Sequence, residues 1–363
     1  MVKRGDLLQN RYQVVKTLGQ GGFGKIFEVI DKSDRGKRKV LKVLNLSKFK
    51  DKKTKQTVLD LFKRETEVLQ QLSRSPNAHK LGIPKVESDG YFIHQKNERQ
   101  ETPCLVMEKI NGVNLETWLK QWWNNPLSEN RAITWLKQLI KILDELHDRN
   151  FFHRDIKPSN IMLKPNGKLV LIDFGAVKEY TASYLISIGE GEPGTQIISP
   201  GYTPNEQVEG LSELRSDFFA LGRTFAHLLT GQHPINLPVR DETTLIVTGN
   251  TQLTPQLAWR DKAPQVSEAL ANLIDDLMTL HIEHRPRNTQ EILQRLEEIE
   301  TEKADNPWYW LERSLQEISV PWLLFINSVL FITLLVTGLL WLHAKQQHQS
   351  DRDGRSQNHL AEL

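Results

Sequence analysis

Short apolar runs separated by polar residues mark the N-terminal part of the chain, and this spacing is typical of β-strands. Such runs cover residues 12–17, 26–30 and 39–44. The spacing then changes, because apolar side chains recur at intervals of three or four residues from about 58 to 72. That period predicts an amphipathic helix with one apolar side. We therefore expect the N-terminal part to combine several strands with one helix.

A stretch without any ionisable side chain covers residues 320–342. As a helix rising about 1.5 Å per residue it would be roughly 35 Å long, which exceeds the ~30 Å hydrocarbon core of a bilayer. Trp322 and Trp341 stand at its ends, where indole rings favour the membrane interface. The alternative is a C-terminal helix that packs against the preceding domain. Such a helix would have one side in solvent and would need a polar stripe there. We expect one membrane-spanning helix that contacts lipid.

The composition bounds the organisation of the chain. It has 363 residues, a formal net charge of +2 and one cysteine, Cys104. The length suits a folded domain at 12–300, a juxtamembrane linker at 301–319, the span at 320–342 and a short polar tail at 343–363. A single cysteine excludes an intramolecular disulfide and suits a reducing cytosol. The low net charge argues against nucleic acid as a partner, and the polar residues 1–10 argue against a signal peptide.

The most informative motif is His153-Arg154-Asp155-Ile156-Lys157-Pro158-Ser159-Asn160, followed by an apolar run and Asp173-Phe174-Gly175. Phosphoryl transfer requires an aligned hydroxyl and cations that neutralise charge on the transferred group. Asp155 is suited to accept the hydroxyl proton, and Lys157 can reach the same phosphate. Asn160 and Asp173 offer hard oxygen ligands for Mg²⁺, with Mn²⁺ as an alternative. A bare His-Arg-Asp is common by chance, whereas this combination is not.

The combination resembles the protein kinases over about four-fifths of the chain. The resemblance implies an α+β, two-lobed protein-kinase fold, with a small β-rich N-lobe that contains one helix and a larger helical C-lobe. Residues 18–26 are glycine-rich and lie between two strand-like runs, not between a strand and a helix. That context disfavours a dinucleotide-binding fingerprint and suits a flap over nucleotide phosphates. Glycine would let backbone N–H groups approach phosphate oxygens without a Cβ in the way.

Two charged side chains of the N-lobe are implied to act together. Residues 39–44 are similar to the kinase strand whose lysine reaches the α- and β-phosphates, here Lys42. Strand alternation puts its rival, Lys39, on the opposite face. In the predicted helix Glu65 resembles the glutamate that pairs with this lysine, because apolar residues at i+4 and i+7 share its face. The other candidate, Glu67, is expected to face solvent.

The resemblance also implies a nucleotide pocket. Residues 102–112 should form a buried strand that runs into the connector between the lobes, with Met107 at the back of the pocket. Glu108 and Ile110 would offer a carbonyl and an N–H to adenine, and Met162 would close the pocket from below. The residues implied to bind ATP are Leu18, Gly19, Gln20, Gly21, Gly22, Phe23, Gly24, Lys25, Ile26, Val40, Lys42, Met107, Glu108, Ile110 and Met162.

Residues 173–206 point to a protein substrate. This segment begins with the Asp-Phe-Gly motif, is rich in Gly, Ser and Thr, and ends in a sequence that resembles the kinase Ala-Pro-Glu motif with two substitutions. By resemblance, the glutamate of that motif, Glu206, pairs with Arg285, and Asp217 on a buried helix holds the catalytic loop. Small-molecule kinases generally lack this platform. Lys157 resembles the serine/threonine branch of the family, which implies Ser or Thr hydroxyls as acceptors.

The resemblance implies regulation through Arg154, through a phosphorylated residue of the activation segment and through Ser199. Arg154 resembles arginines that clamp a phosphate on the activation segment. The candidate acceptors are Thr181, Ser183, Ser187 and Thr195, of which Thr195 is favoured, with self-association allowing trans-autophosphorylation. Ser199 resembles the threonine whose hydroxyl bonds the catalytic Asp and Lys. Phe174 is expected to have a structural role.

The sequence thus predicts a single-pass membrane kinase similar to the eukaryotic-type serine/threonine kinases of bacteria. ATP is cytosolic, so the kinase domain should face the cytoplasm, although Lys and Arg residues around the span weakly favour the reverse orientation. The leading alternative is a nucleotide-binding pseudokinase that acts as a membrane scaffold. A small-molecule kinase is a further alternative. Every catalytic position is filled, which favours the enzyme.

Overall fold

The computed structural model of the chain describes residues 2–21, 24–49, 51–75, 81–95, 101–121, 126–174, 199–247 and 250–304. The chain forms two compact units, Met1–Ile299 and Glu300–Leu363. In the second unit the described residues are 300–304, which continue helix α8 (Thr289–Ala304), so the first four residues of the predicted linker are helical. The predicted membrane span and tail lie outside the described residues. Within the described ranges, no helix is both long and apolar enough to cross a bilayer.

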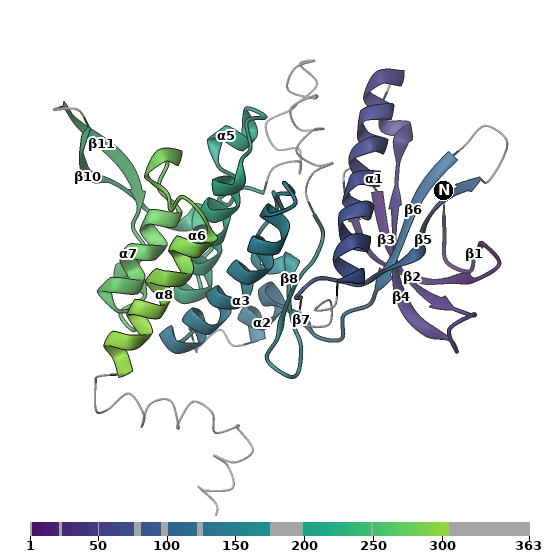
Figure 1. The fold of residues 1–363 in the computed structure, drawn as a ribbon, viewed down its shortest axis with the longest axis horizontal. Helices are drawn as coiled ribbons and strands as arrows, with labels where there is room; N and C mark the ends of the chain where they lie inside the picture. The colour runs from purple at the N-terminus through teal and green to yellow at the C-terminus, as the bar shows by residue number, and fades with distance from the viewer. Residues whose placement is uncertain are drawn as a thin grey trace, which may run out of the picture. The chain divides into compact units, whose positions relative to one another are not determined.

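The N-lobe is built on an antiparallel sheet of six described strands (Figure 1). Its spatial order is β1 (Leu7–Leu8), β2 (Tyr12–Gly21), β3 (Gly24–Asp31), β4 (Lys37–Leu44), β6 (Glu101–Glu108) and β5 (Val86–Gln95). The strands predicted at 12–17, 26–30 and 39–44 lie within β2, β3 and β4. Along β4 exposure alternates, with Lys39 and Leu41 buried and Val40 and Lys42 half-buried. This alternation gives the sheet two distinct faces.

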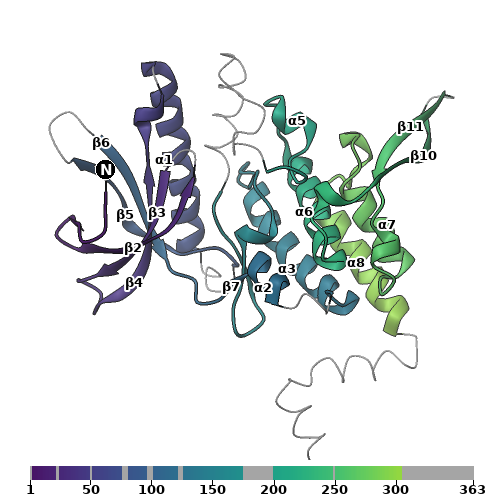
Figure 2. The same cartoon turned by 180° about the vertical axis from the view of Figure 1, so that it is seen from behind.

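Helix α1 (Lys52–Arg74) lies beside the sheet next to β5 in both views (Figures 1 and 2). It begins six residues before the predicted start at 58, so Lys52, Lys53 and Lys55 also belong to the helix. Asp51 caps the helix, because its side chain accepts a hydrogen bond from the Thr54 N–H at 2.7 Å. The first turn is polar, and the apolar period therefore appears only from Val58 onwards.

The N-lobe sheet is covered by apolar side chains on both faces. One face joins the main core, which includes residues of α1 and of the C-lobe. The other face has its own cluster, in which Tyr12, Val29 and Leu41 pack with Cys104. Burial raises the pKa of the Cys104 thiol to about 12, so this thiol stays protonated at neutral pH.

The C-lobe is helical, as predicted. Its helices are α2 (Leu115–Gln121), α3 (Glu129–His147), α5 (Asn205–Val208), α6 (Leu214–Thr230), α7 (Glu268–Leu277) and α8. A small antiparallel sheet of β7 (Val113–Asn114), β8 (Ile161–Leu163) and β9 (Leu169–Leu171) carries the residues next to the connector. Short 3₁₀ turns are Leu46–Lys48, Pro158–Asn160, Pro234–Asn236, Arg260–Lys262 and Ile282–His284. Helix α6 is buried along almost its full length and lies behind the site described below.

A β-hairpin in the C-lobe was not predicted. Strands β10 (Val239–Val247) and β11 (Asn250–Leu257) pair antiparallel and project beyond α7 (Figures 1 and 2). The sequence contains a signal for it, since residues 243–247 include four β-branched side chains and are followed by Gly249 and Asn250, which favour a tight turn. The C-lobe is therefore not purely helical.

Candidate active site

A cavity of about 450 Å³ lies in the first unit and is lined by both lobes. Of the residues implied to bind ATP, nine line it: Leu18, Gly19, Ile26, Val40, Lys42, Met107, Glu108, Ile110 and Met162. Gln20, Gly24 and Lys25 belong to the β2–β3 hairpin but do not line the cavity, and Gly21 is the last residue of β2. Gly22 and Phe23 lie outside the described residues. The structure therefore brings together the residues expected on the adenine side of the pocket.

Gly24 lies at the end of that hairpin, and packing between strands explains this glycine, not the expected approach of the backbone to phosphate. Gly24 pairs with Gly21 across the turn and with Leu44 of β4. A Cβ at Gly24 would collide with the Val43 carbonyl oxygen, so the backbone of β4 requires glycine there. At Gly19 a Cβ would meet nothing within 4 Å. Close packing between strands thus explains Gly24 without any phosphate.

Lys42 connects three parts of the fold at the inner end of the cavity. Its Nζ donates to Glu65 Oε1 of α1 at 2.7 Å and lies 3.3 Å from Asp173 Oδ1. Glu65 is 1% exposed, so this carboxylate is buried, whereas the Lys42 side chain keeps 18% of its surface exposed. Lys39 lies on the other face of β4, where its ammonium is 2.9 Å from Asp31. The pairing expected between Lys42 and Glu65 is present, and Lys39 is directed elsewhere.

The loop 153–160 brings four polar side chains together. Ser199 Oγ donates to Asp155 Oδ1 at 2.6 Å, and Lys157 Nζ donates to the same Oγ at 2.7 Å. Lys157 Nζ also lies 3.0 Å from Asp155 Oδ1. Asn160 Nδ2 donates to Asp155 Oδ2 at 2.7 Å and to the Asp155 carbonyl at 2.8 Å. Both carboxylate oxygens of Asp155 are therefore fixed by charged or polar donors.

Asp217 of α6 anchors this loop from below. Its carboxylate accepts hydrogen bonds from the backbone N–H groups of His153 at 2.8 Å and Arg154 at 2.7 Å. His147 Nε2 lies 3.0 Å from the same carboxylate. Burial would raise the pKa of Asp217, but the hydrogen bonds from His147 and from the Arg154 N–H hold the pKa below its ordinary value. Asp217 is thus a buried anion that orders the loop backbone.

The Asp-Phe-Gly motif is held by the same loop. Phe174 is 2% exposed, and its ring lies 4.8 Å from the His153 ring and 5.5 Å from the Phe151 ring. Burial lowers the pKa of His153, so its imidazole is neutral, and its Nε2 lies 3.2 Å from the Ile172 carbonyl. Arg154 and Asp173 have positive φ values of 65° and 60°, which are uncommon for residues with a side chain. The backbone therefore takes an uncommon conformation at both motifs.

The pair expected at the end of the activation segment is also present. Arg285 Nη1 donates to Glu206 Oε1 at 2.6 Å, and Ser216 Oγ donates to the same oxygen at 2.8 Å. Burial would raise the pKa of Glu206, but hydrogen bonding and charge from Arg285 hold it below its ordinary value. Arg154 has its guanidinium over the Phe152 ring. The favoured phosphorylation site, Thr195, lies outside the described residues, as do Thr181, Ser183 and Ser187.

One contact near the predicted peptide platform was missed. The Tyr202 hydroxyl lies 2.6 Å from His227 Nδ1 of α6. Burial raises the pKa of Tyr202 and lowers that of His227 to about 4, so a neutral phenol donates to a neutral imidazole. Nothing in the spacing of residues within α6 distinguishes a buried histidine of this kind from a solvated one. The bond ties the 199–203 turn to the buried helix.

Asn160 and Asp173 are suited to hold a divalent cation. The Asn160 amide nitrogen is directed to Asp155, so its carbonyl oxygen is the atom available for a metal. Both residues line the cavity, and carboxylate and amide oxygens are the ligands Mg²⁺ prefers. Groups of three or more His, Cys, Asp or Glu side chains suited to a metal are absent from the described part of the chain. The pair fits an ion that takes its other ligands from phosphate and water.

Comparison with known proteins gives a consistent family. The sequence profile of the protein kinase domain matches residues 12–296. The serine/threonine-protein kinase PknA of Nostoc sp. is 33% identical over 293 residues, which is 80% of this chain and 48% of that protein. Serine/threonine-protein kinase F of Synechocystis sp. is 34% identical over 294 residues, 79% of this chain and 55% of that protein. The chain spans about half the length of the curated relatives it matches.

Among solved structures, the apo form of PpkA-294 has a TM-score of 0.59 at 20% identity and covers 82% of this chain and 99% of that one. At this level of identity the likeness concerns the fold alone. It agrees with a β-rich lobe joined to a helical lobe.

Proposed function

Because the chain belongs to the protein kinase family, we propose that it is a serine/threonine protein kinase that transfers the γ-phosphate of ATP to protein hydroxyls. The observation that carries the proposal is the position of Ser199 Oγ, 2.6 Å from Asp155 Oδ1 and 2.7 Å from Lys157 Nζ. A serine hydroxyl there donates to a carboxylate and accepts from an ammonium. These are the contacts that an attacking hydroxyl needs.

In the proposed reaction Asp155 accepts the proton of the acceptor hydroxyl as the hydroxyl oxygen attacks the γ-phosphorus. The bond from the γ-phosphorus to the β,γ-bridging oxygen breaks, and ADP leaves with the electron pair. Lys157 stabilises charge on the transferred group, and Lys42 binds the α- and β-phosphates. Glu65 holds Lys42 in place through the 2.7 Å ion pair. Asn160 and Asp173 hold Mg²⁺ or Mn²⁺, which when bound neutralises charge on the phosphate oxygens.

The adenine of ATP lies between the two lobes in this proposal. Val40 and Met162 contact its two faces, and Met107 lies behind it. The connector offers the Glu108 carbonyl and the Ile110 N–H, and both residues line the cavity. Glu108 N–H itself donates to the Lys85 carbonyl at 2.8 Å, which fixes the strand end from which the connector starts.

The proposal includes regulation and location. Thr195 is phosphorylated by a second copy of the chain, and Arg154 binds that phosphate. Residues 320–342 span the membrane once, with the kinase domain in the cytoplasm. Alkaline extraction of membranes tests the span, and protection of the kinase domain from added protease in sealed vesicles of known orientation tests its side. Release of the intact chain by carbonate would contradict the anchor.

The kinase proposal is tested by transfer of labelled γ-phosphate to a generic protein substrate by the full-length chain in lipid. We expect Asp155→Asn to lower the rate by about 10²- to 10⁴-fold, the range typical of general-base residues. Asp148→Asn is the matched control, because it makes the same change at an exposed aspartate after α3. Folded, ATP-binding protein that transfers no label would favour the pseudokinase scaffold.

A further inference from the structure

Helix α6 carries one arginine whose charge no carboxylate balances. Arg223 is half-buried, and its guanidinium carbon lies 5.0 Å from the centre of the Phe219 ring. No residue in the described part of the chain forms an ion pair or a hydrogen bond with this side chain. Burial lowers the pKa of Arg223 to about 10, and no nearby acidic group raises it again. The side chain is still charged at neutral pH, so the helix holds a cation without a counterion.

Two neighbouring arginines do have carboxylate partners, which makes Arg223 the exception. Arg285 has its guanidinium 4.9 Å from the centre of the same aromatic ring and pairs with Glu206 at 2.6 Å. Arg215, about two turns earlier on α6, pairs with Glu213. These three arginines therefore have two carboxylates between them, and one positive charge remains.

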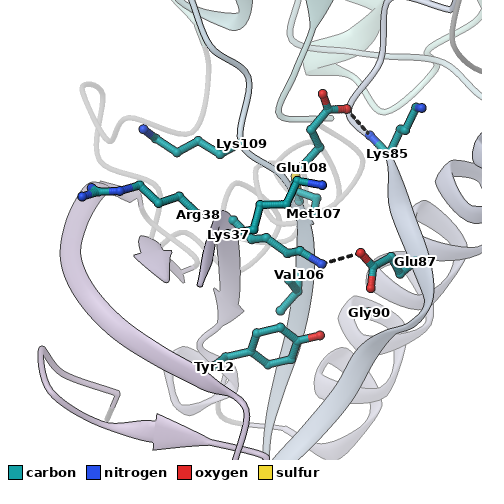
Figure 3. Close-up of a pocket in the computed structure, with 11 residues that line it drawn as sticks. Tyr12, Lys37, Arg38, Lys85, Glu87, Gly90, Val106, Met107, Glu108 and Lys109 are labelled. Carbon is teal, nitrogen blue, oxygen red and sulfur yellow. Dashed lines mark hydrogen bonds and ion pairs between the residues drawn. The ribbon is translucent and has the colours of Figure 1, made fainter. Parts of the chain in front are cut away.

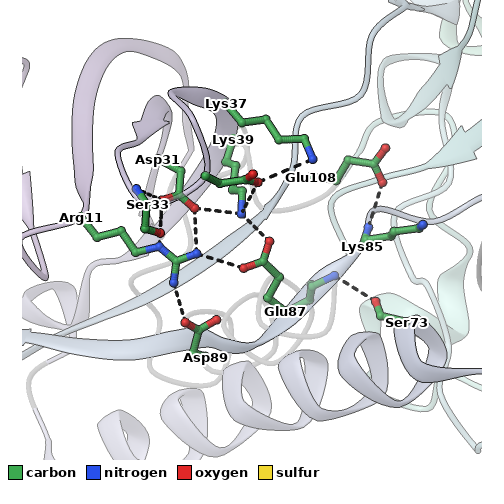
Figure 4. Close-up of polar contacts among 12 residues, drawn as sticks. Arg11, Asp31, Ser33, Lys37, Lys39, Ser73, Lys85, Glu87, Asp89 and Glu108 are labelled. Carbon is green, nitrogen blue, oxygen red and sulfur yellow. Dashed lines mark hydrogen bonds and ion pairs between the residues drawn. The ribbon is translucent and has the colours of Figure 1, made fainter.

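Charged clusters of the N-lobe show the usual arrangement around a buried cation. Lys39 is 5% exposed, and its ammonium pairs with Glu87, which is drawn in Figure 3. Asp31 pairs with the same ammonium at 2.9 Å and with Arg11 at 2.8 Å (Figure 4). A buried charge that lacks such a partner destabilises the folded chain. An anion from outside the chain would therefore be stabilised at Arg223.

The charged end of Arg223 is open to solvent. Of its three side-chain nitrogens, Nε is enclosed without a hydrogen-bond partner, whereas Nη1 and Nη2 are not enclosed. These two nitrogens belong to the planar fork that binds a carboxylate through two parallel hydrogen bonds. The ring contact holds the guanidinium in place, so little side-chain freedom is lost when an anion binds.

Arg223 adjoins the parts of the fold that are expected to bind protein. Asp217, which holds the catalytic loop, lies six residues earlier on α6, or about 9 Å along the helix axis. The aromatic ring beneath Arg223 also contacts Arg285, whose partner Glu206 ends the activation segment. A typical interface covers about 800 Å² on each protein, a patch roughly 30 Å across. A protein substrate that presents its hydroxyl to Asp155 can therefore also contact Arg223.

We propose that Arg223 is a docking point for an acidic side chain of the protein substrate. The proposal rests on the proposed kinase function and adds a substrate class, namely proteins with an exposed Asp or Glu away from the acceptor hydroxyl. That carboxylate accepts hydrogen bonds from Nη1 and Nη2 and supplies the missing counterion. Arg223 does not line the nucleotide cavity, so it contributes to binding of the protein and not to the transfer step.

The probes are dephosphorylated casein, which is acidic, and myelin basic protein. Steady-state kinetics use the full-length chain in a non-ionic detergent. Arg223→Met should raise KM for casein about ten-fold, because hydrogen bonds to a charged group are lost. Values of kcat, of KM for ATP and of KM for myelin basic protein should stay within two-fold. Arg223→Lys keeps the charge without the fork and should raise KM for casein about three-fold.

Arg131→Met is the matched control for loss of one positive charge. Arg131 is exposed on α3 and likewise forms no ion pair within the described residues. Its replacement should change KM for casein less than two-fold. An equal rise of KM in Arg131→Met and Arg223→Met would overturn the assignment to Arg223, because it would reflect net charge alone.

Equilibrium binding separates this proposal from the proposed activity. Fluorescence anisotropy of labelled casein, with a non-hydrolysable ATP analogue present, requires no phosphoryl transfer. A chain that transfers no phosphate but binds casein about ten-fold more weakly as Arg223→Met would refute the kinase function and keep the docking point. Equal affinity of the two chains, or absence of saturable binding by the unmodified chain, would overturn the docking point.

Stability gives a further readout. Arg223→Met replaces a charge without a counterion by an apolar side chain, so the midpoint of denaturant unfolding should stay the same or rise. A lower midpoint in Arg223→Met would show that the fold itself uses this charge, and it would overturn the proposal.

Discussion

Two sets of charged side chains in this molecule differ in how much of each remains exposed. Lys42, Lys157 and Asp173 line or border the nucleotide cavity and keep 18%, 23% and 20% of their side chains exposed. Asp217 and Arg285 do not line that cavity, and their side chains are 0% exposed. The first set has surface left for a ligand, whereas protein groups surround the second set completely. Similar ion pairs therefore serve ligand binding in one region and architecture in the other.

The largest effect should come from the buried set. Asp217→Ala leaves two backbone N–H groups and His147 without their acceptor in the interior. We expect the free energy of unfolding to fall by about 3–5 kcal/mol, as for other broken buried charge pairs. Denaturant unfolding of the full-length chain measures this. Asp276→Ala is the control, because it breaks a partly exposed pair with Arg295 and should cost less than about 1 kcal/mol.

The next effect concerns the exposed set. Lys42→Met should lower the rate of phosphoryl transfer by about 10²- to 10³-fold, the range for removal of one preorganised donor. The free energy of unfolding should fall less than in Asp217→Ala, because Glu65 can take up a proton once its cation is gone. Lys63→Met, which changes an exposed lysine on α1, should leave the rate unchanged. A Lys42→Met rate within three-fold of the unmodified chain would contradict the division between the two sets.

Ser199 tests whether a neutral hydroxyl can couple the partly exposed Lys157 to Asp155, whose side chain is 5% exposed. Ser199→Ala removes the bridge between Asp155 and Lys157 and should lower kcat about ten-fold. Ser199→Thr keeps the hydroxyl and should restore most of the rate. Steady-state kinetics should show the loss in kcat with little change in KM for ATP. Equal impairment of both variants would indicate that the backbone of the turn matters, and not the hydroxyl.

The smallest effect is a dependence of stability on pH at Glu206. Its pKa in the folded chain lies below the ordinary value of 4.5, so its contribution is complete above that value and is lost as the pH falls through the folded pKa. The difference in unfolding free energy between the unmodified chain and Glu206→Gln should therefore shrink as the pH falls below about 4.5. Unfolding curves between pH 7 and pH 3 measure this. A difference that stays constant over this range would contradict the assignment.

Much of the candidate site could be predicted because its chemistry is concentrated in a short segment. Asp155, Lys157 and Asn160 lie within six residues, and local backbone geometry brings them together. The pairs Lys42–Glu65 and Glu206–Arg285 join residues 23 and 79 positions apart. For such pairs the spacing carries little information, and the resemblance to a known family supplied them.

The parts that were not predicted have identifiable physical reasons. The first turn of α1 is lysine-rich and is set by the Asp51 cap, which leaves no apolar period to detect. The bond between Tyr202 and His227 depends on tertiary burial. The β10–β11 hairpin carries a turn signal in its sequence, but the family resemblance implied a helical lobe at this position. Family resemblance thus supplied the site residues, but it did not supply the helix cap, the Tyr202–His227 bond or the hairpin.

The single cysteine has a practical consequence for studying motion. Cys104 is fully buried in β6 and its thiol stays protonated, so thiol-directed reagents should not react with it. Spectroscopic labels can therefore be attached to cysteines introduced at exposed positions without first removing the native one. A label at Lys63 on α1 and another at Asp148 in the C-lobe would report the distance between the lobes as ATP binds.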